Sequence, residues 1–139
     1  MRVIKARALV EGIAEGEALV SPKPISFYGG VDPKSGLIVE KGHPLEGANV
    51  AGKVLVFPYG KGSTVGSYVI YELAKRRLAP SAMVNLESEI IIIAGCVLSS
   101  IPLVDRPEED PFKIIKSGDY VKVIAEGKVA EIIVEDNDG

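Results

Sequence analysis

The sequence predicts a single α/β domain with a mixed sheet and few helices. Before residue 60, short apolar segments alternate with turns, which is the pattern of paired β-strands and not of repeated βαβ units. Residues 54–78 then pass from a strand through a glycine-rich loop to a helix, and residues 119–134 predict a closing hairpin. The 139 residues contain neither an internal repeat nor a low-complexity tract, so we expect residues 1–139 to form one domain.

Alternating side chains predict the first strands. Apolar or small residues occupy every second position early in the chain, at Ile4, Ala6, Ala8 and Val10. Gly12 begins a turn, and residues 17–21 predict the returning strand. A further short strand is expected at residues 37–39, between two loops rich in glycine and proline.

The central unit of the chain is a buried strand followed by an amphipathic helix. Residues 54–57 are a continuous apolar run, which is typical of a strand covered on both faces. Apolar residues then recur on one side of a helix, at Val65, Val69, Ile70, Leu73 and Leu78. The basic residues 75–77 complement the negative end of the helix dipole in the last turn, and Pro80 stops the helix.

The second half of the chain predicts alternating short elements. Residues 82–85 and 101–104 are expected to be strands, and 106–111 a polar loop. The intervening segment 88–100 is ambiguous: its four isoleucines favour a strand, whereas Ser88 and Glu89 suit the start of a helix. We favour a helix. Residues 119–125 and 128–134 form the hairpin, and the acidic end at 135–139 is expected to fray.

Charge and composition exclude several classes of function. A formal net charge of −3 argues against nucleic acid or an anionic membrane as the main partner. The longest apolar run, residues 90–98, is far shorter than the about 20 residues of a membrane span. The single cysteine, Cys96, cannot form an internal disulfide, which indicates a cytoplasmic location.

The chain lacks the side chains for an ordinary metal centre. Its single cysteine and single histidine, Cys96 and His43, can neither hold an iron–sulfur cluster nor build a usual zinc site alone. His43 also has no nucleophile-elbow motif near it, so a Ser-His-Asp triad is not indicated. We expect no metal ligands and no cofactor bound by this chain, and any catalytic metal must come from another polypeptide.

A glycine- and hydroxyl-rich loop, residues 58–67, connects the central strand to the helix. Free backbone N–H groups at such a junction attract anions, and glycine allows a ligand to approach the backbone. The loop is not a P-loop, because Gly62 follows Lys61 where Ser or Thr belongs. It is not a dinucleotide fingerprint either, because the gap between Gly62 and Gly66 is too long by one residue.

Each candidate residue also has a purely structural interpretation. Ser63 or Thr64 suits the N-cap of the following helix, and Lys61 suits a solvated surface charge. Other positions have equally plain explanations: a turn for Gly29 and Gly30, a turn cap for Asp32, a surface loop for His43 and the core for Cys96. Glycines on both sides of the loop exceed what a cap requires, which favours a functional role.

Several motifs in order resemble the aconitase X small subunit or small domain. The most distinctive is the run Ser-Phe-Tyr-Gly-Gly-Val-Asp-Pro at residues 26–33. It is followed by matching positions at Gly36, His43-Pro44, Gly47, Gly52, Val54-Leu55, Pro58, Gly62-Ser63, Ala79-Pro80, Ala82, Val84 and residues 101–104. The resemblance covers about residues 3 to 135, nearly the whole chain.

The resemblance implies a swivelling β/β/α domain that docks on a larger, aconitase X-like subunit carrying an iron–sulfur cluster. It implies that Ser63 is the proton acceptor of a hydro-lyase. The other residues that it places at the substrate or in the cleft are Lys61, Gly62, Thr64, Gly29, Gly30, Asp32 and His43. Lys61 stands where the family often has arginine, so it keeps the charge and loses the planar, bidentate fork.

The substrate implied by the resemblance is a phosphorylated hydroxy acid, (R)-5-phosphomevalonate, dehydrated to trans-anhydromevalonate 5-phosphate in the archaeal mevalonate route to isoprenoids. The alternatives are another hydroxy acid, such as a hydroxyproline, and a non-catalytic interaction module. If the chain is catalytic, the loops at residues 27–32 and 42–47 are expected at the same end of the domain as Ser63.

Overall fold

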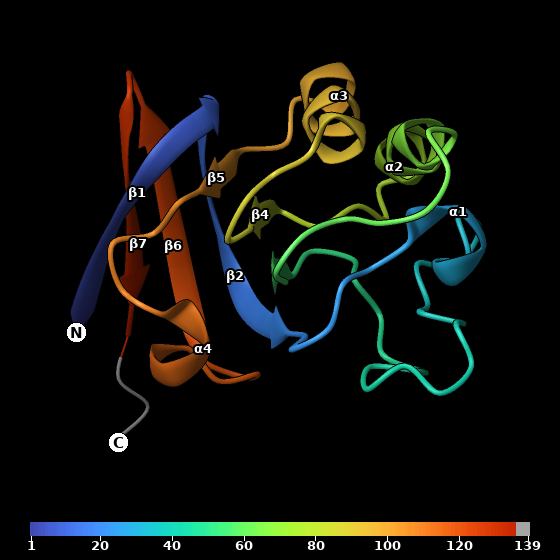
Figure 1. Cartoon of the computed structure of the whole chain (residues 1–139), viewed down its shortest axis with the longest axis horizontal. Coiled ribbons are helices and arrows are strands. Elements are labelled where there is room, and N and C mark those ends of the chain that lie inside the picture. The colour runs from blue at the N-terminus through green and yellow to red at the C-terminus, as the bar shows by residue number, and fades with distance from the viewer. Residues whose placement is uncertain (136–139) are drawn as a thin grey trace.

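Seven strands form a closed, mixed β-barrel in the computed structural model, which describes residues 1–135 (Figure 1). Around the barrel the strands follow the order β1-β5-β4-β3-β2-β6-β7. The antiparallel strands β1, β6 and β7 lie on one side of the molecule, and the helices α1 and α2 on the other (Figure 1). The predicted α/β class with a mixed sheet is confirmed. The acidic end, residues 135–139, is expected to fray. Of these, residues 136–139 lie outside the described part of the chain.

The antiparallel side of the barrel consists of its four longest strands. These are β1 (Arg2–Val10), β2 (Gly12–Val20), β6 (Tyr120–Glu126) and β7 (Val129–Val134). The alternation that predicts β1 is confirmed, because Ile4 and Ala6 are buried inside the barrel. The second strand begins earlier than the expected residue 17, because Gly12–Glu17 pairs with β6.

The other side of the barrel is parallel and is built by two crossover helices. The strands β3 (Val54–Val56), β4 (Ala82–Val84) and β5 (Leu103–Asp105) run parallel to one another, and β3 runs parallel to β2. The connections between them are α2 (Gly66–Lys75) and α3 (Ile90–Ser99), because parallel neighbours need a long crossover. The helix favoured for residues 88–100 is therefore confirmed.

The parallel strands separate two apolar cores. Val54, Val56 and Val84 point into the barrel, whereas Leu55 and Met83 point toward the helices. Both faces of these strands are buried, which explains their uninterrupted apolar sequences. Cys96 belongs to the helical core, with its Sγ 3.7 Å from Met83 Sδ. Burial raises the pKa of its thiol to about 12, so Cys96 is an inert packing residue, as expected.

Three further expectations are wrong. Residues 37–39 do not form a strand, since only isolated bridges join Leu37 to Asn49 and Ile38 to Val31. The helix α2 ends at Lys75, and two basic residues lie beyond its last turn: Arg76 is the C-cap and Arg77 has a positive φ of 60°. A short helix, α4 (Pro111–Ile114), begins at the end of the expected 106–111 loop.

The remaining helix, α1 (Phe27–Gly30), is one interrupted turn. Tyr28 and Gly29 have non-helical backbone angles, so the segment behaves as the loop that the sequence predicts. Among residues 1–135, no helix has the length and apolar character required to cross a membrane.

Candidate active site

The loop after β3 is held in place by two neighbouring segments. On one side, Pro58 O accepts backbone N–H groups from Leu86 and Glu87, at 3.0 and 3.4 Å. On the other, Ile25 pairs with the loop: its N–H donates to Tyr59 O, and its carbonyl accepts the Lys61 N–H at 3.0 Å. The backbone leading to Ser63 is therefore anchored on both sides, while residues 61–65 remain exposed.

Two glycines of this loop are required by close packing. A Cβ on Gly60 would collide with the side chain of Ile92 in α3. A Cβ on Gly62 would overlap Ser26 Oγ, and the φ of Gly62 is +91°, a region that side chains disfavour. Ser26 thus packs directly against the loop, although sequence reasoning did not include it among the site residues.

Ser63 is exposed and organises a turn upstream of the helix. Its Oγ accepts the N–H of Val65 at 3.2 Å, and its carbonyl accepts the N–H of Gly66 at 2.9 Å. The N-cap of α2 is Val65, with no side-chain cap. Val65 itself has helical backbone angles, so Ser63 makes a cap-type hydrogen bond in the turn that leads into α2, in keeping with its structural interpretation. The Ser63 hydroxyl can still donate its own proton or accept another.

The free backbone N–H groups lie within the predicted loop, just before the first turn of α2. The first N–H groups of α2, at residues 66–68, are taken by the carbonyls of Ser63, Thr64 and Val65. Within residues 1–135, by contrast, the N–H groups of Gly62, Ser63 and Thr64 have no acceptor. Consecutive unpaired N–H groups next to a residue of positive φ are suited to binding an anion.

Lys61 brings a cation to the same loop. Its Nζ lies 3.4 Å from Glu40 Oε2, in an ion pair that is open to solvent. Such a pair contributes roughly 0–1 kcal/mol, so an anionic ligand can displace Glu40 at little cost. Lys61 is thus available to an anion at the Ser63 loop.

A buried carboxyl group lies behind the loop. Glu89 is the N-cap residue of α3, and its Oε1 is buried against Gly60 with no hydrogen-bond partner among the described residues. Burial raises the pKa of this carboxyl, because the charged form loses solvation.

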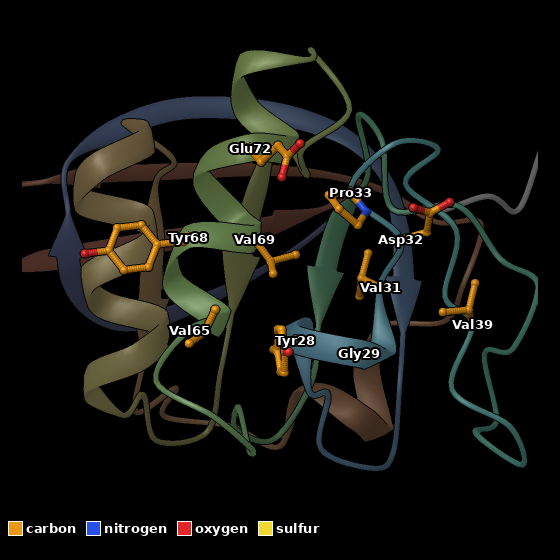
Figure 2. A pocket seen from close by; sticks show the side chains of 10 residues that line it. All are labelled: Tyr28, Gly29, Val31, Asp32, Pro33, Val39, Val65, Tyr68, Val69 and Glu72. Atoms are coloured by element: carbon orange, nitrogen blue, oxygen red, sulfur yellow. The ribbon is translucent and has the colours of Figure 1, made fainter.

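The segment at residues 27–32 lies at the Ser63 end of the domain, as predicted. Phe27 and Tyr28 pack near Gly66 at the start of α2. Between this segment and α2 lies a groove of 520 Å³, and Tyr28, Gly29 and Asp32 contribute to its lining (Figure 2). Gly30 is buried against Glu40 and does not line the groove.

Asp32 serves mainly as a turn residue. Its carboxylate accepts the Ser35 hydroxyl at 2.7 Å and the Lys34 N–H at 3.1 Å. These hydrogen bonds, that from Ser35 most strongly, lower the pKa of Asp32, so the carboxylate stays charged. The structural interpretation of Asp32 is confirmed, and its negative charge remains at the edge of the groove.

His43 is neither a surface residue nor free to line a cleft. Its side chain is buried, and Nδ1 accepts the Leu45 N–H at 3.0 Å. Nε2 lies 3.1 Å from Pro24 O, so hydrogen bonding assigns the neutral tautomer with the proton on Nε2. His43 holds the 42–47 loop against residues 21–24, and no residue of that loop lines the groove.

Sequence reasoning missed a buried polar network beneath the site. The Arg7 guanidinium binds both carboxylate oxygens of Asp105, at 2.8 and 2.9 Å. Asp105 accepts the Ser88 N–H at 2.8 Å, the Ser88 hydroxyl donates to Asn85 Oδ1 at 2.8 Å, and Asn85 Nδ2 donates to Phe57 O at 3.0 Å. The network ends at Phe57, the residue before the Ser63 loop. Its one signal in the sequence is the polar residue directly after each of the apolar runs 82–84 and 103–104, Asn85 and Asp105, since parallel strands end at one edge.

Comparison with known proteins identifies the family. Residues 3–132 match the family model of the aconitase X swivel domain. The chain belongs to the aconitase X family. The resemblance that the sequence motifs indicate is therefore confirmed, and so is the swivel fold.

Solved and curated relatives agree with this assignment. The crystal structure of Thermococcus kodakaraensis aconitase X in its holo-form superposes with a TM-score of 0.88 at 46% identity, covering 96% of this chain and 99% of that one. The phosphomevalonate dehydratase small subunit of Methanococcoides burtonii is 51% identical over 130 residues, 94% of this chain and 95% of the relative. That of Methanosarcina mazei is 56% identical over 119 residues, 86% of this chain and 83% of the relative.

Proposed function

We propose that this chain is the small subunit of a phosphomevalonate dehydratase, a hydro-lyase that works in the cytoplasm. The reaction removes water from (R)-5-phosphomevalonate and gives trans-anhydromevalonate 5-phosphate, in isoprenoid biosynthesis. The observation that carries the proposal is identity of 51–56% to small subunits of this name, over 83–95% of each chain. The name of these relatives also supports a large subunit as the partner.

In the proposed reaction, Ser63 Oγ accepts the proton from the carbon beside the substrate carboxylate. The electron pair of that C–H bond forms the double bond, and hydroxide leaves from the neighbouring carbon. A serine is normally a weak base, so its oxyanion must be stabilised in the closed site. The Val65 N–H already donates to this oxygen at 3.2 Å, and Lys61 is close in sequence.

The reaction also requires that the anionic substrate be bound. The unpaired N–H groups of Gly62, Ser63 and Thr64 are suited to this. The substrate is an anion at its carboxylate and at its phosphate, and backbone N–H groups bind such oxygens without a change of charge on the protein. Binding at these groups would hold the substrate beside Ser63. Lys61 would add a cation as it exchanges Glu40 for the substrate.

The side chains of this polypeptide do not suit the iron–sulfur cluster expected for the family. Within residues 1–135, no group of three His, Cys, Asp or Glu side chains could hold a metal ion, and Cys96 is buried against Met83. We therefore assign the cluster to the large subunit, where it would act as a Lewis acid. The contribution of this chain is the proton acceptor and its oxyanion environment.

The substrate assignment predicts a sharp preference in a direct assay. The chain, reconstituted with its own large subunit, is expected to dehydrate (R)-5-phosphomevalonate and to leave a hydroxyproline unchanged. The reason is that a phosphate ester and an amino acid need differently charged binding groups. The measurement is kcat/KM for both compounds. A higher kcat/KM for the hydroxyproline would assign the chain to another dehydratase of the family.

A further inference from the structure

An exposed apolar groove begins beside the Ser63 loop. Val65 and Val69 line it from the α2 side, and Tyr28 and Val31 from the α1 side (Figure 2). The groove has a volume of 520 Å³. Two carboxylates, Asp32 and Glu72, lie at its edge (Figure 2). Because Val65 follows Ser63 by two residues, whatever occupies the groove also lies next to the proposed proton acceptor.

Large side chains of the groove are left in solvent by the isolated chain. Tyr28 is 57% exposed and Tyr68 66% exposed, and Val39 and Val65 are exposed as well. Clusters of this kind mark binding surfaces, and tyrosine is enriched at the centres of protein interfaces, where one end of the ring stays polar. The composition of the groove therefore indicates a binding surface.

The charges of the groove argue against the substrate as its occupant. The carboxylate of Asp32 is kept ionised by its hydrogen bonds, chiefly from Ser35. Among the described residues, Glu72 forms an ion pair only with Arg76, the C-cap residue of α2, at 3.2 Å and exposed to solvent. An apolar floor edged by two carboxylates repels a phosphorylated carboxylic acid, which would find no cation on the groove lining.

We propose that this groove is the docking site for the large subunit, and that it receives an apolar or aromatic side chain of that subunit flanked by lysine or arginine. The apolar floor would bury the side chain, and Asp32 and Glu72 would pair with the flanking cation. A subunit seated here covers the Ser63 loop and excludes water from it. This proposal rests on the proposed function, since it names the surface on which the partner assembles.

The test is the affinity of single variants for the purified large subunit, measured by isothermal titration calorimetry. Tyr68→Glu is expected to raise the Kd at least about 10-fold, because it places a charge in the apolar floor of an interface. Glu72→Lys is expected to raise it too, through repulsion of the flanking cation. The matched controls are Val129→Glu, at a position 60% exposed on β7, and Glu15→Lys on β2; both should leave the Kd unchanged.

Other outcomes would overturn the docking site. If Tyr68→Glu leaves the Kd for the large subunit unchanged but raises the KM for (R)-5-phosphomevalonate, the groove is a substrate subsite. A homodimer of the wild-type chain that Tyr68→Glu dissociates, with no effect on the large subunit, would make it a contact between copies. This test does not depend on the role of Ser63. If Ser63→Ala keeps full turnover while Tyr68→Glu loses affinity for the large subunit, the docking site is supported and the proton-acceptor proposal is wrong.

Discussion

Replacing Ser63 with alanine is expected to lower the kcat of the reconstituted dehydratase by on the order of 10²-fold or more, the usual scale for a lost proton acceptor. The KM should change far less, because the proton transfer belongs to the transition state. The fold should survive, because Ser63 is exposed and loses one hydrogen bond, from the Val65 N–H, at a net cost of about 0.5–1.5 kcal/mol. The measurement is steady-state kinetics together with a thermal melt.

Ser67→Ala is the matched control for this experiment. Its hydroxyl donates to Thr64 O at 3.0 Å, so its removal loosens the same turn without touching Ser63. Turnover should therefore stay within a few-fold of the wild type in Ser67→Ala. If Ser63→Ala keeps near-normal turnover, or if both variants lose turnover in step with a lowered Tm, Ser63 is a structural residue of the turn.

Replacing Arg7 with alanine is expected to lower the free energy of unfolding by about 3 kcal/mol. Asp105 is completely buried, and its bidentate partner is Arg7. Removing the guanidinium would leave a buried charge with one remaining backbone donor, Ser88. The measurement is urea denaturation of the purified chain.

Lys5→Ala provides the control on the same strand. Its ion pair with Glu131, at 2.9 Å, has a similar length but is open to solvent on both sides. A pair of this kind contributes roughly 0–1 kcal/mol, so Lys5→Ala should be close to neutral. Equal losses in the two variants would mean that the Arg7–Asp105 pair stabilises the protein no more than a surface ion pair does.

Local patterns in the sequence were sufficient to predict most of the elements. The alternation from Ile4 to Val10 is a strand because one face of β1 is buried in the barrel. The isoleucine run is a helix despite its β-propensity, since Ile92 and Cys96 recur at helical spacing and pack into the core between the helices and β3–β5. By contrast, residues 37–39 have strand-like composition but pair only through single bridges, so no strand forms.

The details of the site depend on tertiary contacts that sequence patterns do not record. His43 is buried because residues 21–24 pack against its ring, although the flanking glycine and proline suggest an exposed loop. The Arg7–Asp105 pair joins two strands that are distant in sequence and become neighbours when the barrel closes. The free N–H groups lie at residues 62–64, because the turn at Ser63 uses those at the helix start.

We propose that this chain supplies one half of a catalytic site and that the large subunit completes it. The most direct measurement is dehydration of (R)-5-phosphomevalonate by this chain alone, by the large subunit alone and by the two mixed. Turnover is expected only in the mixture, rising with added small subunit until it saturates. Dehydratase turnover or iron-dependent absorbance from this polypeptide alone would contradict the claim, and so would full activity of the large subunit by itself.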